Sequence, residues 1–144
     1  MQLSSPAFDH QGTIPSKYTC DGSNISPPLA ISGVPSEARS LVLLVDDPDA
    51  PGGTFVHWVV YDIPPDVKVI HENTDPGTLG TNNFRKTSYG GPCPPSGTHR
   101  YFFKIYALDR DLKLSPGQSK QQVEREMSGH IIAQTELIGL YERV

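Results

Sequence analysis

Two aspartates, two histidines and a tyrosine stand where strand-like runs meet loops rich in proline and glycine. Asp47 and Asp49 belong to the loop DPDAP. His57 lies inside an apolar run, and His99 and Tyr101 follow the segment GGPCPPSGT. A carboxylate, two imidazoles and a phenol beside apolar side chains are the groups of a small polar pocket with apolar walls. Binding of a small ligand is therefore the chemistry that these residues first suggest.

The DPDAP loop can hold a carboxylate in a fixed place. Pro48 and Pro51 fix their own φ angles and keep the preceding residues extended, so the loop is stiff. A stiff loop presents a carboxylate to a ligand with little loss of entropy. The alternative, which the sequence leaves open, is that Asp47 and Asp49 only cap local turns by accepting backbone N–H bonds.

The two histidines are better candidates for ligand binding than a single one would be, because each lies beside a loop rich in proline and glycine. A lone histidine in an apolar strand is more often an ordinary core residue. His99 also shares one face of its expected strand with Tyr101, because strand side chains alternate with a period of two. The nearby Gly90–Pro92 stretch can offer free backbone N–H groups, which favour phosphate or another oxyanion.

Motifs for catalysis and cofactor binding are absent from the sequence. It contains no GxSxG nucleophile elbow, no His-Glu-x-x-His pair, and no phosphate-loop or dinucleotide fingerprint. Two histidines and an aspartate could in principle form a metal triad with open positions. The expectation is nevertheless a protein without enzymatic activity, metal or cofactor.

Composition indicates the class of fold. Proline (14) and glycine (13) make up about a fifth of the 144 residues, against an average near 12%. Both residues destabilise helix interiors, so a helical bundle is disfavoured. The length suits one domain, residues 1–144, with a core of its own. We therefore expect one mainly β domain with long loops.

Charge and hydropathy exclude several classes of partner. Sixteen acidic residues face twelve basic ones, for a net charge of −4, and lysine and arginine do not cluster. A nucleic-acid partner is therefore not expected. No apolar run approaches the roughly 20 residues of a membrane span, and the N-terminus lacks the basic and apolar regions of a signal peptide. A cytoplasmic protein without stable membrane insertion is expected.

Four segments have the pattern of strands and one that of a helix. The strands are expected over 40–46, 55–63, 99–108 and 130–140. Strict alternation over 55–63 would put His57 on one face with Phe55, Val59 and Tyr61. A helix is expected over 116–128, with Ser115 as its cap, Pro116 at its first position and Gly129 as its stop. One helix in a β chain favours a two-sheet sandwich.

Two cysteines, Cys20 and Cys93, lie far apart in the sequence. In a cytoplasmic protein they are most simply two small buried thiols. If the loops that carry them meet, they form a disulfide bond instead, worth about 4 kcal/mol on a chain-entropy estimate. The sequence leaves this choice open.

Several of these segments together resemble one protein family. DPDAP (47–51), GPCPPSGTHRY (91–101), YTCDGSNISPPL (18–29) and FVHWVVYDIP (55–64) are similar to the short prokaryotic branch of the phosphatidylethanolamine-binding protein family, also called the Raf kinase inhibitor protein family. The resemblance implies a two-sheet antiparallel Greek-key β-sandwich with a small anion-binding pocket at one end. It implies no catalysis and no metal.

The resemblance also assigns residues to that pocket. The residues implied to bind the ligand are Asp47, His57, Gly91, His99 and Tyr101. Those implied to shape or support its rim are Asp49, Pro51, Pro92 and Arg100.

The expected function is non-enzymatic binding of a small anionic or phosphorylated ligand. His57 and His99 would donate hydrogen bonds, together with the Tyr101 hydroxyl and N–H groups near Gly91. Binding would then strengthen as pH falls through about 6.5, where a free histidine gains its proton. The alternative is inhibition of a serine protease, or modulation of a kinase, through surface loops such as 71–98. Short relatives in this family also make a homodimer a possibility.

Overall fold

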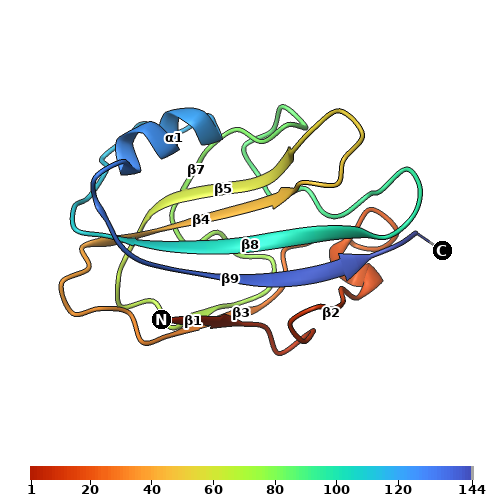
Figure 1. Cartoon of the computed structure of the whole chain (residues 1–144), viewed down its shortest axis with the longest axis horizontal. Coiled ribbons are helices and arrows are strands. Elements are labelled where there is room, and N and C mark those ends of the chain that lie inside the picture. Colours follow the sequence, from red (N-terminus) through yellow and green to blue (C-terminus); the bar gives the residue numbers. More distant parts are fainter. Residues whose placement is uncertain (144) are drawn as a thin grey trace.

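Two β-sheets lie face to face in this computed structural model, which describes residues 1–143 (Figure 1). The larger sheet consists, in spatial order, of β2 (Gly12–Thr13), β9 (Ile131–Tyr141), β8 (His99–Leu108), β4 (Ser40–Asp47), β5 (Phe55–Ile63) and β7 (Thr78–Leu79). The smaller sheet consists of β1 (Gln2–Ser4), β3 (Leu29–Ser32) and β6 (Val69–Ile70). The mainly β, two-sheet expectation is confirmed.

All strand pairs in both sheets are antiparallel except one. The short β2 runs parallel to the end of β9. The long strands β5 and β8 begin and end at the predicted residues, while β4 extends one residue further, to Asp47, and β9 is shifted by one residue. These strands were recognisable because each is a run of apolar or β-branched residues ended by proline, glycine or charged residues.

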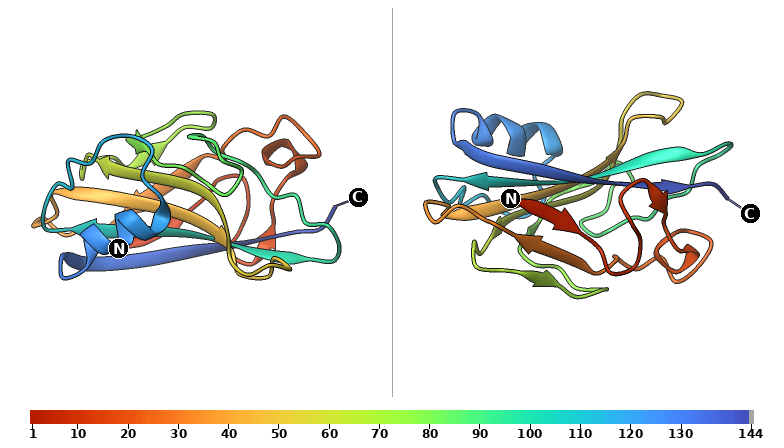
Figure 2. Two further views of the ribbon diagram at one scale, coloured as in Figure 1. Left: turned by 90° about the horizontal axis from the view of Figure 1, so that it is seen from above. Right: turned by 60° about the horizontal axis from the view of Figure 1, so that its bottom comes forward.

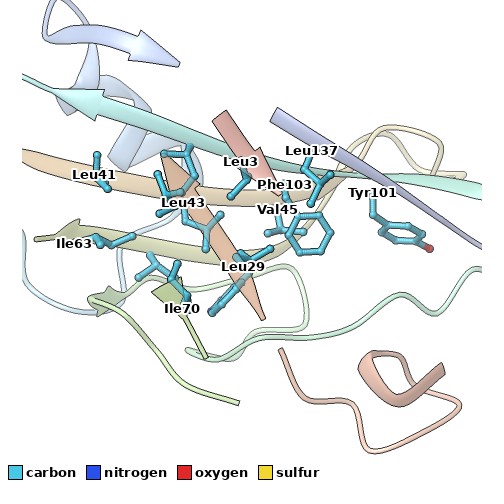
Figure 3. Packing of buried hydrophobic residues seen from close by; sticks show 14 of the residues in the cluster. Leu3, Leu29, Leu41, Leu43, Val45, Ile63, Ile70, Tyr101, Phe103 and Leu137 are labelled. Atoms are coloured by element: carbon cyan, nitrogen blue, oxygen red, sulfur yellow. The ribbon is translucent and has the colours of Figure 1, made fainter. Parts of the chain in front are cut away.

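The larger sheet is buried on both faces by two separate groups of side chains. One group fills the space between the sheets and includes Leu43, Trp58 and Phe103; Figure 3 shows part of it. The other group, which includes Leu44 and Val123, lies under the helix α1 (Lys120–Met127) on the opposite face. Figures 1 and 2 show α1 and the small sheet on opposite sides of the larger sheet.

The predicted start of the helix was wrong by four residues. Its cap is Ser119, whose hydroxyl accepts from the N–H of Gln122, while the Gln122 side chain accepts from the N–H of Ser119. Gly117 has φ +93° and donates its N–H to the carbonyl of Leu79. This backbone pairing keeps residues 116–118 beside β7 and out of the helix. The predicted stop before Gly129 is confirmed.

No helix within residues 1–143 is long and apolar enough to span a membrane.

Cys20 and Cys93 are joined by a disulfide bond, so the simpler expectation of two free thiols was wrong. The bond connects the loop after the 3₁₀ helix Ser16–Tyr18 to the loop before β8. The N–H of Cys20 also donates to the carbonyl of Pro92, at 3.1 Å, so a backbone hydrogen bond joins the two loops beside the disulfide.

Removing the disulfide should lower the free energy of unfolding by up to about 4 kcal/mol, because the bond closes a loop with a sequence separation of 73 residues. Urea unfolding of the Cys20→Ser/Cys93→Ser variant against the wild type measures this. As a control, a reductant should shift the wild-type midpoint and leave that of the variant in place. Equal midpoints for wild type and variant without reductant would contradict the prediction.

Candidate functional site

A cavity of about 510 Å³ opens at one end of the space between the sheets. Four of the predicted residues contribute polar groups to its wall, namely Asp47, His57, His99 and Tyr101. Its apolar wall includes two phenylalanines and three prolines, namely Phe55, Phe84, Pro51, Pro94 and Pro95. In Figure 3, Tyr101 stands at the end of the row of core side chains, with its hydroxyl directed away from them.

Antiparallel pairing of β4 with β8 brings Asp47 and His99 together. Asp47 ends β4 and His99 begins β8, and the two neighbouring strands meet at the same end of the sheet. Nδ1 of His99 lies 2.6 Å from Oδ2 of Asp47, and both side chains are nearly inaccessible to solvent. Oδ1 of Asp47 accepts the N–H of Asp49 at 2.7 Å. The carboxylate can only accept, so the His99 ring presents Nδ1–H to it and keeps Nε2 for a ligand.

A β-bulge in β5 directs His57 to the cavity. Val45 pairs with Trp58 and Asp46 pairs with Val56, so His57 is the extra residue. Val59 contributes to the core under α1, whereas the His57 ring lies 5.3 Å from the ring of Tyr101, between centroids, on the other face. The prediction that His57 shares a face with Val59 and Tyr61 was therefore wrong, because the bulge interrupts the alternation on which it depended.

His57 is held through one nitrogen and enclosed by aromatic rings. Its Nδ1 lies 2.7 Å from the carbonyl oxygen of Gly90, which can only accept, so Nδ1 carries the hydrogen. The rings of Phe55 and Phe84 lie 5.1 Å and 5.4 Å from it. Burial lowers the pKa of His57 from its usual 6.5, and the Gly90 carbonyl and the charge of Asp47 only partly oppose this. A neutral ring offers the cavity a hydrogen-bond acceptor, Nε2, and not the donor that was expected.

The hydroxyl of Tyr101 has no hydrogen-bond partner among the described residues, although the residue is only 1% exposed. Burial is the main cause that raises its pKa, and the nearby Asp47 carboxylate adds to it without forming a hydrogen bond of normal geometry, so the group remains protonated and can donate. A buried hydroxyl without a partner is unfavourable by about 1–3 kcal/mol. A ligand in the cavity would supply the missing acceptor.

Gly91, which the resemblance implied to bind the ligand, and Pro92, implied to support the rim, are not among the residues that line the cavity. The N–H of Gly91 donates to Oδ1 of Asn24 at 2.8 Å, so it is not free for an anion. A Cβ atom at Gly91 would collide with the Tyr18 carbonyl and the Asn24 side chain. Glycine is required here because two loops approach closely, and the expected backbone donor is used within the protein.

Asp49 and Arg100 form a bidentate ion pair outside the cavity. Nε and one terminal nitrogen of Arg100 lie 2.9 Å and 2.8 Å from the two carboxylate oxygens, and the N–H of Arg100 donates to the same group. The guanidinium lowers the pKa of Asp49 to about 2. The pair joins the DPDAP loop to the start of β8, while Pro51 of the same loop lines the cavity. Asp49 and Arg100 thus support the rim.

Asn82 and Phe84 contribute to the candidate site and were missed by sequence reasoning. The buried Asn82 donates from its amide to the carbonyls of His57 and Ser88, and its Oδ1 accepts the N–H groups of Phe84 and Lys86. These bonds shape the loop that places Phe84 against His57. The paired asparagines in TNNF were the available signal, because asparagine side chains often organise loops through backbone bonds.

No group of three or more histidine, cysteine, aspartate or glutamate side chains within residues 1–143 is arranged to hold a metal ion.

The buried His57 should make the protein less stable in acid. Its pKa is lower in the folded chain than the 6.5 of the unfolded chain, so below pH 6.5 the unfolded state binds more protons. This contribution is fully favourable above pH 6.5 and is lost as pH falls below it, by at most about 1.4 kcal/mol per pH unit. Unfolding of wild type and His57→Asn between pH 7.5 and 5 measures the difference; parallel curves would contradict the assignment.

Comparisons with known proteins agree with this architecture. The family model described as phosphatidylethanolamine-binding protein matches residues 4–142. A UPF0098 protein from Methanothermobacter thermautotrophicus is 53% identical, over 99% of each chain. The crystal structure of a phosphatidylethanolamine-binding protein homologue from Chlamydia trachomatis has a TM-score of 0.97 at 46% identity, covering 99% of this chain and 97% of the other.

A second solved structure is more distant in sequence. Escherichia coli YbcL, described as a member of the mammalian PEBP family, has a TM-score of 0.91 at 30% identity and covers 99% of this chain and 98% of its own. Family model, relative and both structures thus agree over nearly the whole length. The chain belongs to the phosphatidylethanolamine-binding protein family.

Proposed function

We propose that the chain binds a small oxyanion, such as a phosphate headgroup, in this cavity and releases it unchanged. The observation that carries the proposal is the buried Tyr101 hydroxyl, which has no partner among the described residues and stands beside the Asp47–His99 pair. The ring of Tyr101 is stacked near that of His99, with 6.4 Å between centroids. One anion oxygen can accept from the hydroxyl and interact with Nε2 of His99.

The Asp47–His99 pair supports anion binding through charge. The carboxylate against Nδ1 fixes the orientation of the imidazole and directs Nε2 away from Asp47. A ring that carries a hydrogen on both nitrogens can donate Nε2–H to the anion. The apolar wall formed by Phe55, Phe84 and the prolines would contact the organic part of the ligand. The charged end of the ligand would therefore lie deep in the cavity, with the rest toward the opening.

Binding without chemistry is favoured over hydrolysis by the surroundings of His99. An aspartate–histidine pair activates a serine, threonine or cysteine only when that group is hydrogen-bonded to the second ring nitrogen. No side chain within residues 1–143 makes such a bond to Nε2 of His99. The sulfur of Cys93, in the cavity wall, is committed to the disulfide bond.

The Tyr101→Phe variant should bind phosphoethanolamine about 10-fold to 100-fold more weakly, because a hydrogen bond to a charged group contributes about 1.5–3 kcal/mol. Its free energy of unfolding should change little, since the hydroxyl has no hydrogen-bond partner of normal geometry among the described residues. Calorimetric titration and urea unfolding measure the two effects. The matched control is Tyr106→Phe, on the opposite face of β8, which should change neither binding nor the cavity.

The His99→Ala variant distinguishes this function from the alternative, inhibition of a protease or kinase through residues 71–98. Anion binding should be abolished in this variant, because the Asp47 carboxylate loses its partner. Inhibition of a protease that survives in His99→Ala would indicate a surface function that does not require the cavity. Unchanged phosphoethanolamine affinity would contradict the proposed site.

A further inference from the structure

The cavity wall contains hydrogen-bond acceptors as well as donors. With Nδ1 of His57 committed to the Gly90 carbonyl, Nε2 of the neutral ring can only accept. The Asp47 carboxylate also lines the cavity and can only accept. A fully deprotonated anion likewise has only acceptors. It would therefore meet these two acceptors in a buried place, while its donors would come from Tyr101, His99 and the other polar lining residues, Thr54 and Asn83.

We propose that this cavity selects oxyanions that still carry a proton, namely hydrogen phosphate and phosphate monoesters, over sulfate and phosphate diesters. The inference rests on the proposed function, anion binding in the same cavity. The P–O–H group of the ligand would donate to Nε2 of His57, while its other oxygens accept from Tyr101 and His99. Sulfate and phosphate diesters cannot make the first of these bonds, because they have no hydroxyl hydrogen near neutral pH.

The surroundings of His57 keep it an acceptor. Rotating the ring by half a turn would replace Nδ1 with a carbon opposite the Gly90 carbonyl and break a 2.7 Å bond. For Nε2 to donate while Nδ1 keeps its hydrogen, the His57 ring would have to be protonated and positively charged. That charge would lie against the aromatic rings of Phe55, Phe84 and Tyr101. Burial opposes that charge and lowers the pKa of His57.

The charged and titratable groups that face His57 lie on β4 and β8. On β4, the charges of Asp46 and Asp47 favour the protonated ring, but burial outweighs both. Asp46 is also paired with Lys104 and Lys120, at 3.2 Å and 2.8 Å. On β8, Tyr101 is uncharged and His99 is engaged with Asp47.

Discrimination by a single buried hydrogen bond can be large. A site built to pair with a hydroxyl group rejects an analogue without it, because the buried acceptor then loses its partner, and factors of 10⁴–10⁵ are known for such sites. The cavity here is open at one end, so a smaller factor is expected, about 100-fold.

Calorimetric titration with methyl phosphate and dimethyl phosphate tests the inference on the wild-type protein. At pH 5 both ligands carry one negative charge, and neither has an amine, but only methyl phosphate has a P–O–H group. Methyl phosphate should bind about 100-fold more tightly. The ratio of the two affinities should fall as pH rises past about 6, where a phosphate monoester loses its last proton.

Inorganic phosphate and sulfate form a second pair of probes and should show the same preference. Dimethyl phosphate or sulfate binding as tightly as its partner would overturn the inference while leaving the proposed function intact. Failure of all four anions to bind would contradict the proposed function, and this inference with it.

The His57→Asn variant tests the residue that is responsible. The asparagine amide can still donate to the Gly90 carbonyl, but the acceptor at Nε2 is gone. The preference for methyl phosphate should fall from about 100-fold to within a few-fold. The matched control is His130→Asn, because His130 is also bound through Nδ1, to Asp109 at 2.8 Å, and does not line the cavity. A full preference that persists in His57→Asn would overturn the inference.

Discussion

Both histidines of the cavity are held by the protein through Nδ1, and this constraint decides what each ring can offer a ligand. His99 faces a carboxylate and His57 faces a backbone carbonyl. The same attachment therefore gives two different rings: one is paired with the Asp47 carboxylate, and the other is enclosed by aromatic rings, where burial lowers its pKa. The cavity wall therefore brings together an ion-paired histidine and a histidine that can accept. The ligand proposed above, an oxyanion that still carries a proton, would match both kinds of group.

Much of the architecture could be predicted from local sequence patterns, whereas the details that shape the site depend on distant contacts. The long strands follow from apolar runs that end at proline or turn residues, and β5 and β8 agree with the prediction to the residue. Asp47, His57, His99 and Tyr101 were grouped from strand faces and loop stiffness, and the fold places all four in one cavity wall. The helix start was missed because Ser115 and Ser119 are both plausible caps. The pairing of Gly117 with Leu79, far away in the sequence, decides between them.

The bulge at His57 and the satisfied N–H of Gly91 were beyond local reasoning for the same reason. A bulge exists only relative to a partner strand, so the register of β4 against β5 has to be known. The N–H of Gly91 is used by Asn24, 67 residues earlier. In both cases the residue type pointed to the right region, and tertiary contacts fixed the role. Sites on loops need such bracing, because a ligand is recognised only when its partners are held in position.

The disulfide bond has a consequence for how the chain responds to cleavage. It makes residues 20–93 a covalent ring that contains β4 and β5, the DPDAP loop and most of the cavity wall. A protease that cuts one exposed peptide bond in this ring, for example near the exposed Gly52 and Gly53, would leave two fragments that stay joined. The nicked protein would therefore stay in one covalent piece and migrate as one species until a reductant separates the fragments. In an oxidising environment, proteolytic cleavage in the loops beside the cavity would therefore not separate the two fragments.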